Sequence, residues 1–163
     1  MTELELLSDS AEATEAYAEQ FASCCHGESL TIFLKGELGA GKTTFCRGFL
    51  RGLGHEGNVK SPTYTVVEPY EINGMQLYHF DFYRVNSFEE LEAIGIRDYF
   101  NDESICLVEW PERAADSSLV ADMEIMLTYN DAEDSDNRQL EFSADSEQGA
   151  IILNACFEPC STK

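Results

Sequence analysis

One local pattern limits what this chain can fold into more than any other. The octapeptide Gly36-Glu37-Leu38-Gly39-Ala40-Gly41-Lys42-Thr43 matches the phosphate-binding loop pattern, Gly-x4-Gly-Lys-Thr, at every specified position. A short apolar run at residues 30–34 leads into it, and a segment with helical periodicity at 42–53 leads out. A strand directly before the loop and a helix directly after it are not expected for an isolated glycine-rich turn, so we set that simpler interpretation aside. They predict an α/β fold with buried parallel strands.

The residue types of this loop predict that it binds a nucleoside triphosphate together with Mg²⁺. Glycines allow backbone angles that point successive N–H groups at an anion, and a helix N-terminus favours negative charge. Lys42 is expected to bridge the β- and γ-phosphates, and the Thr43 hydroxyl is expected to ligate Mg²⁺. The predicted nucleotide-binding residues here are Glu37, Leu38, Gly39, Ala40, Gly41, Lys42, Thr43 and Thr44.

The remaining chain alternates between helical and strand patterns without a repeat or a linker, which predicts one domain over residues 1–163. A first helix is expected after Ser8-Asp9-Ser10, with Asp9 and Glu12 as a capping pair and Ala13, Tyr17 and Phe21 on its buried face. Asn73-Gly74 predicts a hairpin turn. Further helices are expected at 87–94 and 147–156, and strands at 64–70, 75–82, 105–108, 123–129 and 138–142. The expected fold is a single-domain phosphate-loop fold, with a mostly parallel central sheet, flanking helices and added antiparallel strands.

Charge and composition exclude several classes of protein. The 31 acidic and 10 basic side chains give a formal net charge of −21, which disfavours direct binding of nucleic acid. The simplest interpretation of this acidity is a solvated surface. No apolar stretch approaches a membrane span, and the acidic N-terminus does not resemble a secretory signal, so a cytoplasmic protein is expected. The six cysteines include no Cys-x-x-Cys pair and are expected to be reduced, mostly buried thiols.

Two acidic residues are candidates to complete a metal and water site. A phosphate-loop hydrolase needs an acidic side chain at the end of a neighbouring core strand. Glu109 follows the more apolar strand, so it is the expected Mg²⁺ partner, and Asp81 is expected to orient the attacking water or to reach the metal through water. The alternative for each is a solvated carboxylate at a strand end. Lys42, Asp81 and Glu109 form the predicted catalytic set.

Other residues allow two interpretations each. Ser61-Pro62-Thr63-Tyr64 suits a switch loop that senses the γ-phosphate, or is an ordinary turn. Arg84 is either a positive finger on the phosphates or part of a surface ion pair. His79 is more simply structural than catalytic, and Trp110 is either core or a partner-facing aromatic. No lysine stands in the Asn-Lys-x-Asp context of guanine recognition, so ATP is favoured by elimination.

Five motifs in order make the chain resemble a known family. They are Gly36-x-Leu38-Gly39-Ala40-Gly41-Lys42-Thr43-Thr44, Ser61-Pro62-Thr63-Tyr64, His79-Phe80-Asp81-Phe82-Tyr83-Arg84, Gly95-Ile96-Arg97-Asp98-Tyr99-Phe100 and Glu109-Trp110-Pro111. Together they resemble the bacterial TsaE (YjeE) ATPases of tRNA threonylcarbamoyladenosine (t6A) synthesis. The resemblance covers about residues 30 to 113.

The resemblance implies a compact phosphate-loop ATPase with weak intrinsic activity. It implies action on a complex of TsaD and TsaB, which places threonylcarbamoyl on adenosine 37 of tRNAs that read codons beginning with A, so tRNA would be contacted only indirectly. It also implies that Thr43 and Glu109 hold the metal, that Asp81 is important for hydrolysis, and that Arg138 lies beside the adenine, after a loop at 132–137 that is longer than usual.

Two other functions fit the phosphate loop. A small-molecule or nucleoside kinase shares it, but such enzymes usually need several arginines to clamp a second substrate; Arg47 and Arg51 would share one face of the loop's helix. A nucleotide-dependent interaction module without significant turnover is the non-enzymatic alternative.

Overall fold

Two short apolar strands form the centre of the sheet in the computed structural model, which describes residues 2–130 and 136–157. β2 (Leu30–Lys35) pairs in parallel with β5 (Ser104–Glu109), with Leu34 opposite Glu109. Every residue of β5 is buried, as expected for a strand that is covered on both faces. The apolar runs of the sequence therefore mark the strands that lie deepest.

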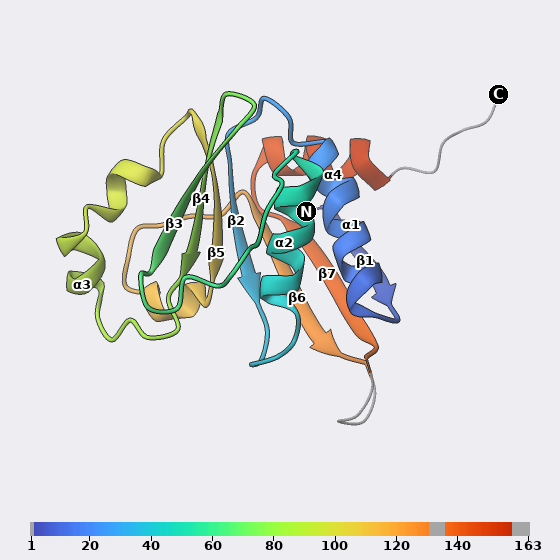
Figure 1. Ribbon diagram of the computed structural model, residues 1–163, viewed down its shortest axis with the longest axis horizontal. Helices are drawn as coiled ribbons and strands as arrows, with labels where there is room; N and C mark the ends of the chain where they lie inside the picture. The colour runs from blue at the N-terminus through green and yellow to red at the C-terminus, as the bar shows by residue number, and fades with distance from the viewer. Residues whose placement is uncertain (1, 131–135, 158–163) are drawn as a thin grey trace.

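The described strands form one seven-stranded sheet in the order β1-β7-β6-β2-β5-β4-β3 (Figure 1). The four middle strands run parallel and include β6 (Met123–Tyr129) and β4 (Met75–Asp81). Antiparallel strands extend both edges: β3 (Val67–Ile72) on one side, β7 (Arg138–Ala144) and β1 (Thr2–Ser8) on the other. This confirms the predicted parallel core with antiparallel additions.

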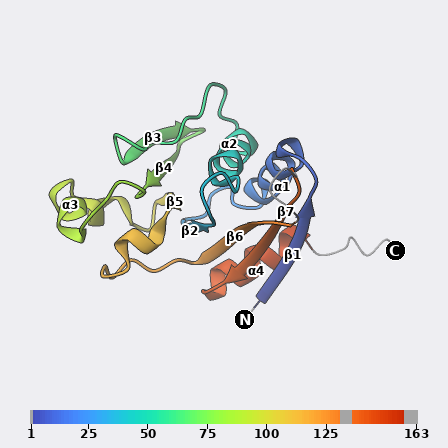
Figure 2. The same cartoon turned by 90° about the horizontal axis from the view of Figure 1, so that it is seen from below.

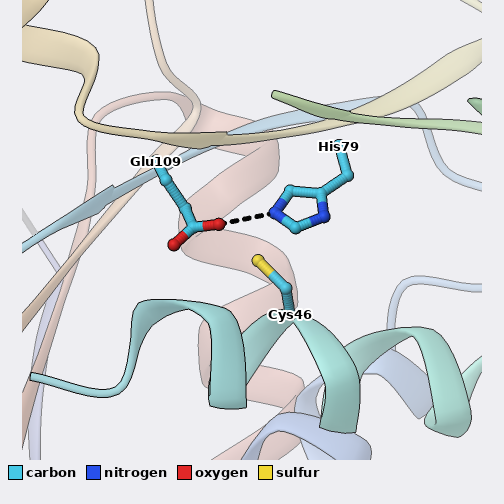
Figure 3. Close-up of side chains that lie close together, drawn as sticks. All are labelled: Cys46, His79 and Glu109. Atoms are coloured by element: carbon cyan, nitrogen blue, oxygen red, sulfur yellow. Dashed lines mark hydrogen bonds and ion pairs between the residues drawn. The ribbon is translucent and has the colours of Figure 1, made fainter. Parts of the chain in front are cut away.

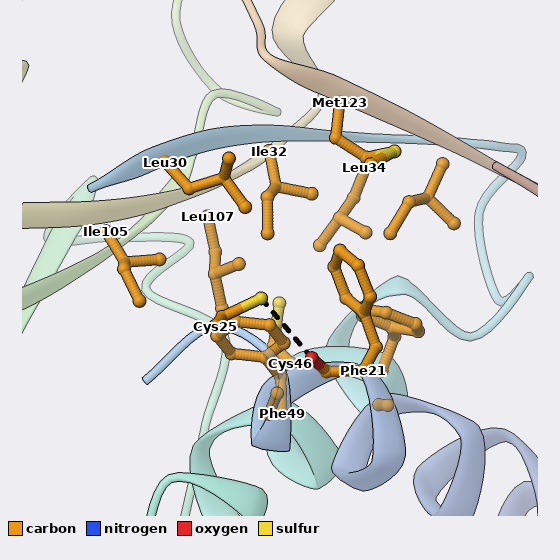
Figure 4. Packing of buried hydrophobic residues seen from close by; sticks show 14 of the residues in the cluster. Phe21, Cys25, Leu30, Ile32, Leu34, Cys46, Phe49, Ile105, Leu107 and Met123 are labelled. Atoms are coloured by element: carbon orange, nitrogen blue, oxygen red, sulfur yellow. Dashed lines mark hydrogen bonds between the residues drawn. The ribbon is translucent and has the colours of Figure 1, made fainter. Parts of the chain in front are cut away.

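Two helices lie side by side on one face of this sheet, as Figures 1 and 2 show. They are α1 (Ala11–Ser23) and α2 (Lys42–Gly52), and their side chains form the larger core cluster with the sheet. Phe21 from α1 and Phe49 from α2 face the aliphatic side chains of β2, including Ile32 (Figure 4). Packing fixes α2 on the sheet, and with it the position of the phosphate loop.

The opposite face of the sheet carries a second, smaller core. The side chains of Phe80, Cys106 and Val108 point there and pack against α3 (Phe88–Ala93) and the short 3-10 helix η1 (Ile96–Tyr99). A further 3-10 helix, η2, spans Pro111–Ala114, and α4 spans Glu147–Phe157 and contacts β1, β7 and α1. No helix in the described ranges is long and apolar enough to cross a membrane.

Several local predictions need correction. The edge strand β1 was not predicted; its alternating side chains pair with β7, far away in the sequence. The buried face of α1 consists of Thr14, Ala18, Phe21 and Ala22, because the helix is rotated from the predicted face toward α2. Its N-cap is Ser10, whose Oγ accepts a hydrogen bond from the Ala13 N–H at 3.0 Å, in place of the expected Asp9 cap.

The start of β3 and the cap of α3 also differ from the predictions, whereas the hairpin between β3 and β4 does not. The strand expected from residue 64 begins at Val67, because Val66 has a φ of 71° and its N–H donates to the Pro62 carbonyl at 2.8 Å, which closes a turn. Ser87 precedes α3 as expected but forms no side-chain capping bond. The hairpin at Asn73-Gly74 is confirmed, since both residues have positive φ, 51° and 80°.

Candidate functional site

The phosphate loop and both candidate carboxylates meet at the carboxyl edge of the parallel strands. The loop follows β2, Glu109 ends β5 and Asp81 ends β4, where the register places Asp81 directly opposite Glu109. Such an edge is where open parallel sheets bind ligands. A cavity of about 360 Å³ opens there, lined by Leu38, Gly39, Gly41, Lys42, Thr43, Thr44, Ser61, Thr63, Asp81, Tyr83, Glu109 and Trp110.

The loop has the backbone that the glycine pattern predicts. Gly36 and Gly41 have φ angles of 141° and 108°, a region that side-chain-bearing residues rarely adopt. A Cβ atom at Gly36 would also overlap the Leu127 carbonyl of the neighbouring strand. Gly41 caps α2 without a side-chain hydrogen bond, so the first N–H groups of the helix point out of its N-terminus toward the cavity side of the loop. This arrangement can receive an anion.

Lys42 is the buried cation of this loop. Its Nζ donates to the carbonyls of Gly36 at 2.6 Å and Glu37 at 2.9 Å, and it lies 4.1 Å from the centre of the Trp110 ring. Burial lowers the pKa of Lys42, and the negative charges of Glu109 and nearby acids oppose that shift. The lysine is thus held at the loop, with the acidic side chains close enough to favour its charge.

Glu109 is held by hydroxyl and imidazole groups from three elements. Its Oε1 accepts from Thr43 Oγ1 at 2.8 Å, and its Oε2 lies 3.2 Å from Ser61 Oγ, whose single hydrogen is shared with Asp81. His79 Nε2 lies 2.7 Å from the same Oε2 (Figure 3), and because an ionised carboxylate only accepts, Nε2 carries the donated hydrogen. His79 is fully buried. These bonds orient one oxygen of Glu109 toward Thr43.

Asp81 is tied to the loop that the sequence analysis left open between a switch and an ordinary turn. Its Oδ2 accepts hydrogen bonds from Ser61 Oγ and, at 3.2 Å, from Thr63 Oγ1, while its Oδ1 accepts from the Tyr83 N–H at 2.9 Å. Both hydroxyls of the loop therefore face the carboxylates. The loop ends at Val66, whose positive φ is a strained conformation for a β-branched residue, costing about 1–3 kcal/mol.

A second cavity lies on the outer side of the loop and shares Leu38 and Trp110 with the first. Its volume is about 780 Å³, and it is lined by Lys35, Gly36, Glu37, Leu38, Trp110, Glu112, Met126, Leu127, Thr128 and Tyr129. Arg138 lies at its edge: the guanidinium is 4.2 Å from the centre of the Tyr129 ring and donates to the Gly39 carbonyl at 3.5 Å. Arg138 therefore does reach the phosphate loop.

Three predicted site residues do not line the inner cavity, and Arg138, at the edge of the outer cavity, is one of them. Glu37 faces the outer cavity, and the Ala40 side chain is fully buried in the core. Arg84 stacks on Tyr64, 4.3 Å from the ring centre, and donates to its hydroxyl, so it is neither a finger on the loop nor part of an ion pair within the described residues. Trp110 is partly buried and packs against Tyr83.

Sequence reasoning paired Thr43 with Glu109 but did not connect His79, Ser61 or Cys46 with it. The alternation of β4 puts His79 and Asp81 on one face, and helical spacing puts Cys46 one turn after Thr43, so both positions carried a signal. Burial, together with the nearby carboxylates of Glu109 and Asp81, raises the pKa of the Cys46 thiol. The cysteine prediction is confirmed for the described thiols: all five are unpaired and four are buried, while Cys160 lies outside the described residues.

Comparison with known protein families gives one match over most of the chain. The family model described as "Threonylcarbamoyl adenosine biosynthesis protein TsaE" matches residues 8–140. This range contains all five motifs of the sequence analysis and every residue that lines the inner cavity. The match extends beyond residues 30–113 on both sides.

Individual relatives give the same result. A protein of Haemophilus influenzae named "tRNA threonylcarbamoyladenosine biosynthesis protein TsaE" is 50% identical over 128 residues, 78% of each chain. Proteins of the same name from Bacillus subtilis and Aquifex aeolicus are 42% and 38% identical, over 68% and 75% of this chain and 68% and 87% of theirs. A solved structure titled as Bacillus subtilis YdiB superposes with a TM-score of 0.79 at 29% identity, covering 95% of this chain and 94% of that one.

Proposed function

Because this chain belongs to the TsaE family of tRNA threonylcarbamoyladenosine biosynthesis proteins, we propose that it binds ATP with Mg²⁺ and hydrolyses it slowly to support that modification. The observation that carries the proposal is the contact between Thr43 and Glu109, 2.8 Å apart, beside Lys42 at an uncapped helix N-terminus. This places a hydroxyl, a carboxylate and a cation around one small cavity. A phosphate-loop hydrolase needs these three groups together.

Lys42 and the helix N-terminus would bind the phosphates. Nζ of Lys42 now bonds two loop carbonyls, and a triphosphate would offer it stronger, charge-assisted acceptors. The first N–H groups of α2 would bind the same phosphates along the helix axis. The ring of Trp110 limits where Nζ can move, because it lies over the ammonium group.

The donor set at this cavity fits Mg²⁺. The Thr43 hydroxyl and the Glu109 carboxylate are oxygen donors of the kind that Mg²⁺ prefers, and their 2.8 Å contact already brings them together. Mg²⁺ would neutralise charge that develops on the phosphate oxygens. Glu109 is kept ready for it, because His79 and Ser61 bond only its other oxygen.

Asp81 would orient the attacking water, and the loop at Ser61 would respond to the nucleotide. In this structure the hydroxyls of Ser61 and Thr63 donate hydrogen bonds to Asp81 Oδ2. They occupy the carboxylate oxygen that would otherwise accept a hydrogen bond from the attacking water. A γ-phosphate would compete for the same hydroxyls. The strained φ of Val66 supports a loop with two arrangements, because moving it would release that strain.

The outer cavity would hold the base. Its apolar wall, the Tyr129 ring and the guanidinium of Arg138 suit a flat aromatic ligand that extends from the loop. ATP is favoured over GTP because the chain lacks the Asn-Lys-x-Asp sequence. The net charge of −21 favours action on the tRNA-modifying proteins, TsaB-like and TsaD-like, over direct contact with tRNA.

The position of the arginines argues against a kinase. All six lie in the described residues, and none lines the inner cavity. Arg47 and Arg51 form ion pairs with Glu15 on α1, at 3.2 and 2.7 Å. No clamp for a second phosphorylated substrate is present among these side chains.

Reconstitution tests the proposal. ATP hydrolysis and t6A formation are measured with TsaB-like and TsaD-like proteins of the same source, with and without this chain. We expect the partners to stimulate hydrolysis, and Lys42→Ala to abolish both nucleotide binding and repeated modification. Arg51→Ala, which removes an exposed cation that pairs with Glu15 by a 2.7 Å contact and lies in none of the five motifs, is the matched control and should behave as wild type.

Each other outcome has a defined meaning. Full modification by Lys42→Ala would disprove the ATP-dependent mechanism. Nucleotide binding without stimulated hydrolysis would favour the interaction module, and transfer of phosphate to a metabolite would favour a kinase.

A further inference from the structure

A second group of side chains of metal-binding types lies beside Oε2 of Glu109, the oxygen that does not bond Thr43. Cys46 of α2, His79 of β4 and Glu109 of β5 each direct one ligand atom to the same place, and these atoms all lie within 4.8 Å of one another (Figure 3). Exposure of these residues is 0%, 0% and 2%. The function proposed above uses Glu109 from this group but leaves the Cys46 thiol without a role.

The chemistry of this group differs from that of the Mg²⁺ position. A thiolate, an imidazole nitrogen and a carboxylate are ligands typical of Zn²⁺ and other thiophilic ions, whereas Mg²⁺ takes oxygen ligands. Zn²⁺ binds such atoms at about 2.0–2.3 Å, which places the ligand atoms about 3.5 Å apart. The His79–Glu109 contact of 2.7 Å would open slightly and the sulfur would move inward by a side-chain rotation.

The local charge also favours a cation. Glu109 and Asp81 are buried carboxylates, 2% and 4% exposed, and Lys42 is the one cationic side chain among the residues that line the inner cavity. A divalent ion would compensate this excess of negative charge and would displace the thiol proton on binding. Nε2 of His79 would become a ligand as its hydrogen moves to the other ring nitrogen, Nδ1, which has no hydrogen-bond partner among the described residues.

We propose that Cys46, His79 and Glu109 form a binding site for a thiophilic divalent ion such as Zn²⁺, and that its occupation draws Glu109 away from Thr43. The site itself stands on the cluster alone. The second half rests on the proposed function, because it makes the thiophilic ion a competitor of Mg²⁺ for one carboxylate. Zn²⁺ would then act as an inhibitor of Mg²⁺-dependent nucleotide binding.

Titration with Cd²⁺ tests the site without any nucleotide. Cadmium–thiolate absorption in the ultraviolet is followed in the full chain, in Cys46→Ser and in Cys106→Ser. Cys106 is the matched control: it is equally buried, but it faces the other side of the sheet and bonds the Tyr99 carbonyl at 3.3 Å. We expect Cys46→Ser to lose one bound Cd²⁺ relative to wild type and Cys106→Ser to lose none. Equal titrations of Cys46→Ser and wild type would overturn the proposal.

A measurement on the wild-type chain avoids dependence on the variants. Anomalous scattering from crystals soaked in ZnCl₂ should place an ion between Cys46, His79 and Glu109. Zinc found only at other thiols would overturn the assignment.

Competition is tested last. Micromolar Zn²⁺ should weaken Mg²⁺-dependent ATP binding at least tenfold in wild type and not in Cys46→Ser; equal effects in both would overturn the competitive role. If neither protein binds ATP at all, the proposed function fails, while the Cd²⁺ and crystal results still decide the site.

Discussion

Replacing Gly48 with alanine should destabilise the protein, although helix propensity alone predicts the opposite. Gly48 lies inside α2, where glycine to alanine gains about 1 kcal/mol. A Cβ atom there would lie 2.7 Å from Cα and 2.9 Å from the carbonyl carbon of Glu15 in α1, and closer still to its carbonyl oxygen. Because all three are backbone atoms, no side-chain rotation relieves the overlap.

The size of the effect follows from that geometry. Ordinary contact begins at 3.4 Å, so α1 and α2 would have to separate by about 1 Å to clear the Glu15 carbonyl oxygen, the nearest of these atoms. Overpacking costs about 1–3 kcal/mol, and the upper end applies because separation also loosens Phe21 against Phe49, whose rings lie 6.0 Å apart. When the gain in helix propensity is subtracted, the free energy of unfolding falls by a net amount of about 2 kcal/mol. For a chain of this length it lowers Tm by about 4–8 °C.

Thermal and urea unfolding of the full chain, followed by circular dichroism, measures this change. Asn154→Ala is the control, because Asn154 is an exposed residue of α4, where a similar but smaller gain in helix propensity is not opposed by burial. We expect that variant to be as stable as wild type or slightly more so. A Tm of Gly48→Ala equal to or above that of wild type would refute the close crossing of α1 and α2.

Three further predictions concern the site and the core. Glu109→Ala should weaken Mg²⁺-dependent nucleotide binding by about tenfold or more and metal-free binding far less, measured by calorimetry with and without EDTA; equal losses would exclude Glu109 as a metal ligand. Phe49→Ala should cost about 3–5 kcal/mol in urea unfolding, because its ring is fully buried; a loss below about 1 kcal/mol would contradict that packing. Iodoacetamide should label the partly exposed Cys24 well before Cys46 and Cys106. Burial raises the pKa of the Cys106 thiol to about 12 and also raises the pKa of the Cys46 thiol, so little reactive thiolate forms at either. Mass spectrometry of the labelled peptides checks the order.

The phosphate loop was predictable because its geometry is local. Gly36 and Gly41 need positive φ whatever the rest of the chain does, and Lys42 and Thr43 follow as the first residues of the helix. The hairpin at Asn73-Gly74 and the buried strand before Glu109 are local in the same sense. In each case a few consecutive residues decide the conformation.

The surroundings of Glu109 were decided by tertiary structure. Asp81 lies opposite it only because β4 and β5 pair in that register, and a shift of one residue would turn both His79 and Asp81 to the other face of the sheet. Cys46 joins them only because α2 packs on that face. Strand alternation and helical spacing assign each residue to a face of its own element, but they do not bring together residues that lie 28 to 63 positions apart.

The edge strand β1 and the rotation of α1 show most clearly what local sequence does not decide and tertiary structure does. β1 exists because β7 offers it a partner, more than a hundred residues later in the chain, and α1 turns Thr14 and Ala18 inward because Gly48 lets the two helices touch. The sequence alone determined the local pieces of this protein: the loop, its flanking strand and helix, and the residue types of the site. Tertiary packing determined which of those pieces face one another, since hydrophobic burial acts between segments that are distant in sequence.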